Sequence, residues 1–490
     1  MNLRSLAAVP FTFLLACSTV SAGAPTGDGN RASRAQHAAA VAAPATGHSA
    51  GDVDGTAVAH MGAAEIAALR AEGPAALERL LLAYDRMHAE SVRDQMAATI
   101  DKVAGQRYAT VSRLYWYEDL EAAKAVAKAT GKPILSLRML GRLDEDLSCA
   151  NSRFFRTTLY PDAAVSTLLR ERFVLHWSSE RNAPRVTVDF GDGRKLESTV
   201  TGNSAHYVLD GDGRPIDVLP GLYAPQVFIR ELTTAATLHA SIRGKTGSER
   251  DQALIAHHQA AMEALNQRWA SLPAIPVIEG SRMLLTGATV TRAAALAQRA
   301  TMSKAYVEVP MLKTVDVGAD PGALPADLEL WAEIGQRLLE VGAPPEAAAA
   351  EAALANRWGL EARAVKPKPG KAAPAAAARP ILDDRARALV DSMLAVPAGG
   401  SRLDDAARAA VIAQLEQTIV ADTALNEVRL RPLIRGYLVS ALMGGDASFA
   451  TVNSWIYTNA FHAPSTDVWM GLLPRDTFTG LPGGAVTGGA

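Results

Sequence analysis

Cysteine is almost absent from this chain: Cys17 and Cys149 are the two thiols among 490 residues. Two cysteines cannot build a disulfide-rich scaffold or a zinc site with four cysteine ligands. Aromatic residues are also scarce, at 6% of the chain, whereas alanine is abundant. This composition favours helices packed through small side chains over a β-sandwich.

An excess of charge of one sign is lacking as well, because 49 Lys and Arg residues oppose 51 Asp and Glu residues. Nucleic-acid binding needs clustered Lys and Arg that displace counterions, so we expect no nucleic-acid partner. Asp210-Gly211-Asp212-Gly213 lacks the spaced acidic ligands of a calcium loop and predicts a hairpin turn. His257 and His258 are adjacent and do not share a helix face. We therefore expect no metal site and no cofactor.

Long hydrophobic runs are lacking, and the short apolar stretch Leu6–Ala16 follows a single basic residue, Arg4. This order is typical of an export signal over residues 1–22, and no later run is long enough to span a bilayer. Leu14-Leu15-Ala16-Cys17 resembles a bacterial lipobox, whereas Val20-Ser21-Ala22 fits ordinary signal cleavage. Either route removes Cys17 from thiol chemistry.

The two processing routes predict an exported protein, either in the periplasm, as an outer-membrane lipoprotein, or secreted. The chain would touch a membrane only through a lipid on Cys17. Composition and periodicity then divide the chain into segments. These are a signal peptide (1–22), a disordered tether (23–60), a helical segment (61–106), an α/β domain (107–245), a helical region (246–364), an Ala/Pro/Lys linker (365–380) and a C-terminal region (381–490) that is helical to about Met443 and ends in a Trp/Gly/Pro-rich segment.

The α/β segment carries the most informative pattern. A helix over Glu118–Thr130 is expected to end at Gly131, where a left-handed residue would stop it. Short runs rich in β-branched and aromatic residues predict strands that alternate with amphipathic helices. The predicted strands are Ile134–Met139, Phe173–Trp177, Val186–Phe190, His206–Asp210 and Ile216–Leu219, and a last helix begins near Pro225.

This order resembles the thioredoxin-like family over Glu118–Leu232. The similarity is carried by Gly131-Lys132-Pro133 before the first central strand, by Cys149 after it, and by the strand–Asp-Gly–strand hairpin. The resemblance implies an α/β domain with a mixed sheet and flanking helices, accompanied by mainly α-helical N- and C-terminal regions.

The resemblance also places the family's nucleophilic cysteine on Cys149 and its resolving cysteine on Ser152. In that family the nucleophile lies at a helix N-terminus, where backbone N–H groups and cations favour a thiolate. A serine cannot attack a mixed disulfide to release the substrate, so dithiol turnover is not expected. The implied supporting residues are Asn151, Arg153, Asn203, Ser204 and His206.

Two further departures from the family are visible. Asn203-Ser204-Ala205 replaces the loop that usually carries a cis-proline facing the sulfur. The insertion Arg185–Thr201 contains Asp189-Phe190-Gly191-Asp192-Gly193, which predicts a hairpin where the family commonly has a crossover helix.

Several readings of these residues stay open at this point. Cys149 is either a reactive thiol beside Arg153 and Arg156 or a buried small hydrophobe. Ser152 either donates to the thiolate or caps the helix together with Asn151. His206 is either a catalytic partner of Cys149 or a structural residue of a strand. In the tail, a density of Trp, Asn and Asp indicates either a packed polar network or a partner surface; the residues concerned are Asp422, Asn426, Asn453, Trp455, Tyr457 and Trp469.

The first functional hypothesis is a monothiol thiol-disulfide oxidoreductase of the cell envelope. Cys149 would form mixed disulfides with a protein or small-thiol partner, and an external thiol would resolve them. The alternative is a non-catalytic envelope binding or assembly module that keeps the fold. A third possibility is a homodimer linked through Cys149.

Overall fold

The computed structural model describes residues 60–199, 204–271, 380–395, 403–461 and several single residues, among them Val58 and Ala463. Every element described here belongs to the unit Asp52–Ala490. The predicted signal peptide with Cys17, most of the tether and linker, and the residues after 463 lie outside the described residues.

Three helices fill residues 63–104 and share a hydrophobic core of their own: α2 (Ala63–Glu72), α3 (Pro74–Arg86) and α4 (Glu90–Ala104). Leu77, Leu80 and Ile100 are among its buried side chains. The short helix α5 (Ala109–Ser112) follows, and α6 (Leu120–Thr130) leads into the sheet. Asp119 caps the first turn of α6, and Gly131 ends it with a φ of 68°, as the sequence predicts.

The sheet contains β1 (Ile134–Leu140), β2 (Val174–Arg181), β5 (Ala205–Leu209) and β6 (Pro215–Pro220) in the order β2-β1-β5-β6. β1 and β2 are parallel, whereas β5 is antiparallel to both of its neighbours, β1 and β6. β1, β5 and β6 are almost entirely buried, which agrees with their mainly apolar sequences.

The connections between the strands place the candidate site. Between β1 and β2 the chain forms α7 (Ala150–Phe154), the π-helical turn η1 (Phe155–Leu159) and α8 (Ala163–Arg172). Between β2 and β5 it forms a separate antiparallel hairpin, β3 (Arg185–Asp189) and β4 (Lys195–Thr199), where the sequence predicts one. After β6 follow α9 (Pro225–Ile242) and α10 (Gly247–Ser271).

The C-terminal region contains α15 (Asp384–Leu394), α16 (Asp405–Leu425), η2 (Asn426–Leu430) and α17 (Arg431–Gly444). The sequence predicts that helical structure ends at about Met443. The structure differs, because α18 (Phe449–Trp455) and η3 (Ile456–Ala460) follow. The Ser448 hydroxyl caps α18 by accepting the Thr451 N–H at 3.2 Å. This cap restarts the helix after Gly445, which has a φ of 75°.

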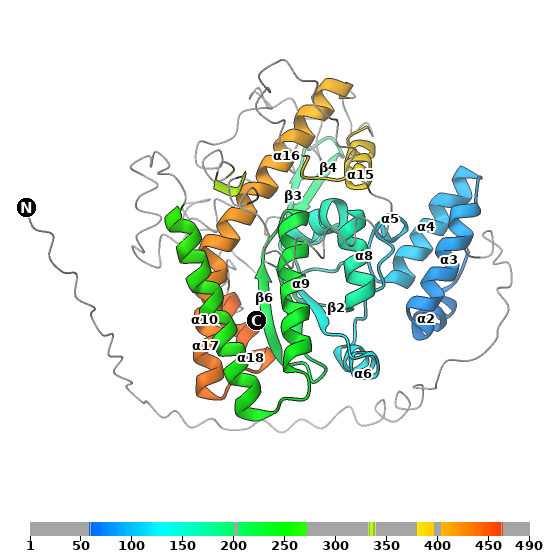
Figure 1. Cartoon of the computed structure of the whole chain (residues 1–490). Coiled ribbons are helices and arrows are strands. Elements are labelled where there is room, and N and C mark those ends of the chain that lie inside the picture. Colours follow the sequence, from blue (N-terminus) through cyan, green and yellow to red (C-terminus); the bar gives the residue numbers. More distant parts are fainter. Residues whose placement is uncertain are drawn as a thin grey trace, which may run out of the picture. The chain divides into compact units, whose positions relative to one another are not determined.

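The sheet and the C-terminal helices share one hydrophobic core. On β5, His206 packs against Phe228 of α9, whereas the neighbouring Tyr207 packs against Phe449 of α18. Because successive side chains of a strand point to opposite faces, the α9 side and the α18 side are the two faces of the sheet. α10 and α17 lie side by side next to the edge strand β6 (Figure 1).

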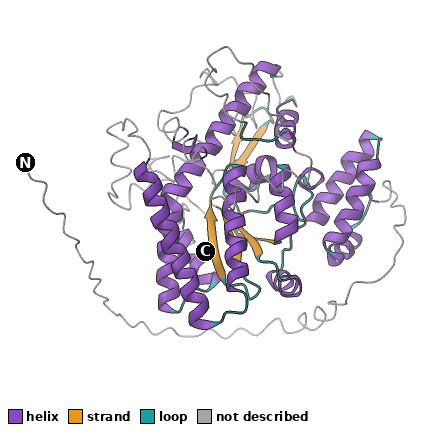
Figure 2. Ribbon diagram, in the orientation of Figure 1, coloured by secondary structure: helices purple, strands orange, loops and turns teal. Residues whose placement is uncertain are grey.

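The fold is therefore a small mixed sheet with flanking helices in a chain whose other described elements are almost all helical (Figure 2). Among the described helices, none combines the length and the apolar character that crossing a membrane requires.

Candidate functional site

Cys149 occupies the N-cap position of α7, directly after the loop that leaves β1. Its backbone N–H donates to the carbonyl of Leu140, the last residue of β1, at 3.0 Å. The side chain is fully buried, with an exposed fraction of 0%. The residue that the sequence singles out thus lies at the end of the first central strand, and it lies inside the core.

The sulfur of Cys149 shares a hydrogen bond with the hydroxyl of Ser204, with Sγ and Oγ 3.0 Å apart. Ser204 directly precedes β5, whose first residue Ala205 pairs with Arg138 near the end of β1. The pairing of the two strands therefore brings the predicted Ser204 against Cys149, although 55 positions separate them. Asn203, the other residue expected at this loop, lies outside the described residues.

Ser152 serves the backbone of this region. Its hydroxyl donates to the carbonyl of Cys149 at 2.8 Å and to the hydroxyl of Ser148 at 2.6 Å. The side chain bonds backward along its own turn, a common arrangement for serine in helices. It therefore bonds neither to the sulfur nor, as an N-cap would, to the first N–H groups of α7. Asn151, which the sequence offers as a second cap, is also buried.

The two nearby arginines hold the loop that carries Cys149. Arg153 Nη1 donates to the carbonyl of Ser148 at 2.6 Å and also contacts Thr199 Oγ1 at the end of the hairpin. Arg156 is buried and donates to the carbonyl of Leu143 at 2.9 Å. Burial lowers the pKa of Arg156 to about 10, which still leaves it charged at neutral pH. Both guanidinium groups thus bind carbonyl oxygens of residues 143–148.

His206 is fully buried on β5 and shares a hydrogen bond with the hydroxyl of Tyr160, 2.7 Å from Nε2. Burial lowers the pKa of His206 to about 3, so the imidazole is neutral at physiological pH. Burial likewise raises the pKa of Tyr160 far above its usual value, and the nearby Cys149 adds to that shift. The His206–Tyr160 pair is therefore uncharged at neutral pH, and the Nε2 atom of His206 is hydrogen-bonded to Tyr160.

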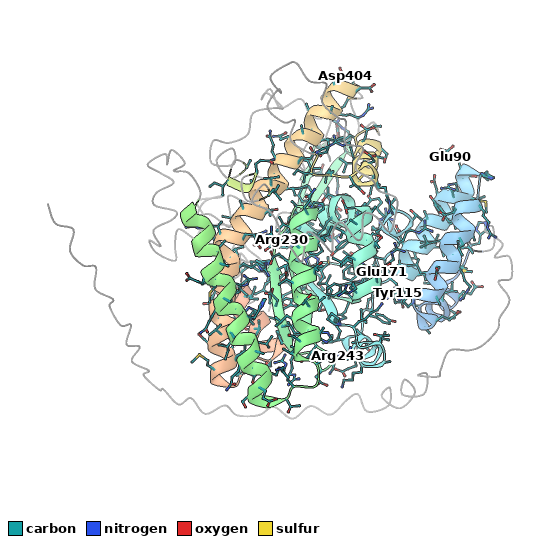
Figure 3. The ribbon with its side chains drawn as sticks, viewed as in Figure 1. Glu90, Tyr115, Glu171, Arg230, Arg243 and Asp404 are labelled. Carbon is teal, nitrogen blue, oxygen red and sulfur yellow. The ribbon has the colours of Figure 1, made fainter. Side chains whose placement is uncertain are left out.

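A second polar cluster, which the sequence does not predict, lies between β6, α9 and the C-terminal helices. Arg431 is 1% exposed and contacts Asp217 on β6 and Glu231 on α9, each at 2.5 Å. It also contacts Glu427 at 3.0 Å, and Arg435 lies 3.6 Å from Asp217. Arg230, which is labelled in Figure 3, completes the cluster with a contact of 2.8 Å to Glu231.

The cluster is electrically balanced, with the three arginines opposite three carboxylates. Burial alone would raise the pKa of Asp217, but Arg431 and Arg435 lower it well below its usual value. The side chains come from β6, α9, η2 and α17, so the cluster joins the sheet to the C-terminal region. The sequence offers one signal for this cluster, the i,i+4 spacing of Glu427 and Arg431 on a helix. That spacing does not reveal that Arg431 also binds Asp217, more than 200 positions away.

The polar residues of the tail are placed as hydrogen-bonding groups at the contacts between elements. Asn426 Nδ2 donates to the carbonyl of Leu222 at 2.7 Å, and the hydroxyl of Thr423 accepts the Ala224 N–H at 2.7 Å. Asp422 is buried beside them. Trp455 stacks on Tyr437 with the ring centroids 4.0 Å apart.

Within the described part of the chain, no group of three or more His, Cys, Asp or Glu side chains is arranged to hold a metal ion. His257 and His258 lie on α10, and His258 Nε2 donates to the carbonyl of Ile216 at 3.0 Å. No protein-family model, curated protein or solved structure matches this chain.

Proposed function

We propose that the chain is a thioredoxin-like protein of the cell envelope that acts as a non-catalytic binding or assembly module. The fold assignment is supported by the order of elements, β1–α7–α8–β2 followed by β5–β6–α9. It is also supported by the strand order β2-β1-β5-β6, with one parallel and two antiparallel pairings.

The enclosure of Cys149 carries the functional part of this proposal. Thiol-disulfide exchange requires a thiolate that a second sulfur can reach, because the attacking and leaving sulfurs must line up. The Cys149 side chain has an exposed fraction of 0%, and its sulfur shares a hydrogen bond with the hydroxyl of Ser204. Ser152 stands where a resolving thiol would be needed, and its hydroxyl is bonded to the backbone. These residues suit a packed core better than turnover.

Exchange between a glutathionylated peptide and reduced glutathione tests this assignment. We expect the wild-type full chain and the Cys149→Ser variant to show the same background rate. A rate that depends on Cys149 contradicts the non-catalytic assignment. Cross-linking in intact producing cells tests the binding role, and we expect the same cross-linked species with wild type and Cys149→Ser.

The second candidate is the monothiol oxidoreductase, and one observation favours it. Cys149 lies at the N-cap of α7 and faces Ser204 across the end of β1, so a rearranged loop would present the sulfur beside a hydrogen-bond donor. A covalent homodimer would also need Cys149 to leave the core. Non-reducing electrophoresis tests it, and a band of twice the monomer mass that disappears in Cys149→Ser supports the dimer.

The location in the cell envelope rests on the sequence order of Arg4, the apolar stretch Leu6–Ala16, and Cys17. Fractionation of cells that produce wild type and Cys17→Ala tests it. Loss of the membrane-bound form in Cys17→Ala supports lipidation at Cys17. Periplasmic or secreted protein in both cases supports ordinary cleavage, and cytoplasmic protein in both contradicts export.

A further inference from the structure

The helices α18 and η3, together with Phe461 and Ala463, are here called the cover segment. We propose that the cover segment is a detachable lid over Cys149, which opens while the sheet remains folded and thereby controls access to the thiol. This inference goes beyond the binding role, because it concerns a state in which Cys149 becomes reachable.

One end of the cover segment is fastened by Asn453. Its Oδ1 accepts a hydrogen bond from the hydroxyl of Tyr207 on β5 at 2.9 Å. Its Nδ2 donates to Glu180 on β2 at 2.9 Å, and Glu180 in turn contacts Arg138 of β1 at 2.6 Å. A single asparagine thus bonds side chains of two different strands across one face of the sheet.

The other end is fastened beside the loop that carries Cys149. Arg181 Nη1 donates to the carbonyl of Ala463 at 3.2 Å. Arg181 pairs with Leu140 at the end of β1, and its own carbonyl accepts the Gly141 N–H at 2.8 Å. Leu140 is also the residue whose carbonyl binds the Cys149 N–H. Ala463 is therefore attached to the same strand ends that position Cys149.

The apolar residues of the cover segment complete the enclosure. Tyr457, Ala460, Phe461 and Ala463 are all buried and belong to the same core cluster as Cys149. Burial raises the pKa of Tyr457, and Cys149 is among the groups close enough to add to that shift. The segment therefore packs on the region of the thiol as well as on the sheet.

The construction of the segment suits opening as a unit. α18 has seven residues and η3 has five, and helices this short are not stable without tertiary contacts. Gly444, Gly445 and Asp446 before them are exposed, and Gly445 adopts a φ of 75°. Opening about this exposed joint would release the bonds at Asn453 and Arg181, and it would also separate Trp455 from Tyr437 of α17, on which it stacks.

The wild-type full chain tests the lid directly. The alkylation rate of Cys149 is measured at increasing urea concentrations below the unfolding transition. Detection by peptide-resolved mass spectrometry separates the Cys149 peptide from any peptide that contains Cys17. A local opening exposes little surface, so we expect a urea dependence well below that of global unfolding. A dependence equal to that of global unfolding overturns the lid.

Substitutions at the two fastenings give a second test. We expect Asn453→Ala and Arg181→Ala each to raise the alkylation rate of Cys149 about tenfold, because each removes bonds that close the lid. Asn459→Ala is the matched control, since Asn459 lies in η3 but donates to the carbonyl of Trp455 within the cover segment itself. If the alkylation rates of the two variants rise only as much as their loss of global stability predicts, the lid proposal is wrong. The glutathione exchange rate of the wild type is a separate measurement, so failure of the lid leaves the binding role standing.

Discussion

The sulfur of Cys149 and the hydroxyl of Ser204 are both fully buried, so their mutual hydrogen bond satisfies polar atoms that water cannot reach. We expect Ser204→Ala to lower the free energy of unfolding by about 1 kcal/mol in urea titrations. Ser440→Ala, on the exposed side of α17, is the control and should change it by less than about 0.5 kcal/mol. Equal effects of the two substitutions would argue against a contribution from this bond.

Arg431 illustrates the larger cost of breaking a buried ion pair. We expect Arg431→Met to lower the free energy of unfolding by about 3–5 kcal/mol, because it leaves the Asp217 carboxylate buried without its closest cation. Lys128→Met removes an exposed ion pair and should cost less than about 1 kcal/mol.

The double variant Arg431→Met with Asp217→Leu separates loss of charge compensation from loss of packing. It should regain much of the stability that Arg431→Met loses, because neither buried charge remains. A double variant as unstable as Arg431→Met would assign the loss to packing alone.

The residue scale also shows where sequence reasoning stops. The resemblance to the thioredoxin-like family implies that the loop before His206 faces the thiol, and this implication points to Ser204. It cannot show that the Ser152 hydroxyl turns back to the carbonyl of Cys149, since a cap and a back-bond use the same residue type. It also cannot show the complete burial of Cys149, because the hydrophobic core that contains Cys149 includes side chains from the distant C-terminal region.

At the scale of elements, two helices share carboxylate caps. Asp162 caps α8 by accepting the N–H groups of Ala164 and Val165. Asp383 caps α15 and also accepts the Ala163 N–H at 2.8 Å, which docks α15 onto the first turn of α8. Burial, and then the nearby Asp383, raise the pKa of Asp162 to about 6.

This raised pKa predicts a pH dependence with a defined sign. Above about pH 6 the charged Asp162 lowers stability, and the penalty disappears as the pH falls from about 6 to about 4, because the folded state binds the proton first. We expect Asp162→Asn, which keeps a capping side chain, to be more stable than wild type by about 1–2 kcal/mol at pH 7.5. The difference should vanish near pH 4.

Urea titrations at the two pH values measure the effect of Asp162→Asn. Asp404→Asn, at the exposed cap of α16, controls for the exchange of one capping side chain for another. An advantage of Asp162→Asn that is the same at both pH values would show that proton binding at Asp162 is not its cause.

Elements with a strong local signal could be predicted. The apolar runs at Ile134 and Ile216 lie in strands, and Gly131 ends its helix, because burial and left-handed backbone each leave a mark in the sequence. The helix α18 could not be predicted with equal ease. It has seven residues, and it is stabilised by contacts such as Tyr207–Phe449 that are distant in sequence.

At the scale of the whole molecule, the distribution of the hydrophobic cores predicts the order of unfolding. The sheet, α16 and α17 contribute to one core, whereas α3 and α4 are buried around another. We expect the amides of β1, β5, α16 and α17 to share the highest protection in native-state hydrogen exchange, and those of α3 and α4 to exchange at lower urea. Earlier exchange of α17 than of β1 would contradict a common cooperative unit.

The attachment of the C-terminal region lies beyond what the sequence reveals. Its helices are visible in the sequence as periodic apolar patterns. The sequence does not distinguish Asp217 from an ordinary polar residue of a strand, whereas the structure shows that Asp217 pairs with Arg431. An isolated buried carboxylate would argue against the strand, so the pairing is what makes that sequence compatible with the fold.

The bonds that close the core join residues far apart along the chain: Tyr207 and Asn453 are separated by 246 positions, Ala163 and Asp383 by 220, and Asp217 and Arg431 by 214. Contacts of such separation give a high contact order, which slows folding because long loops must close first. A ribosome releases β1 long before it releases α18. Until the C-terminal helices have been synthesised, Asp217 lacks Arg431 and one face of the sheet lacks α18. We expect such an incomplete domain to expose apolar surface and therefore to be prone to aggregation.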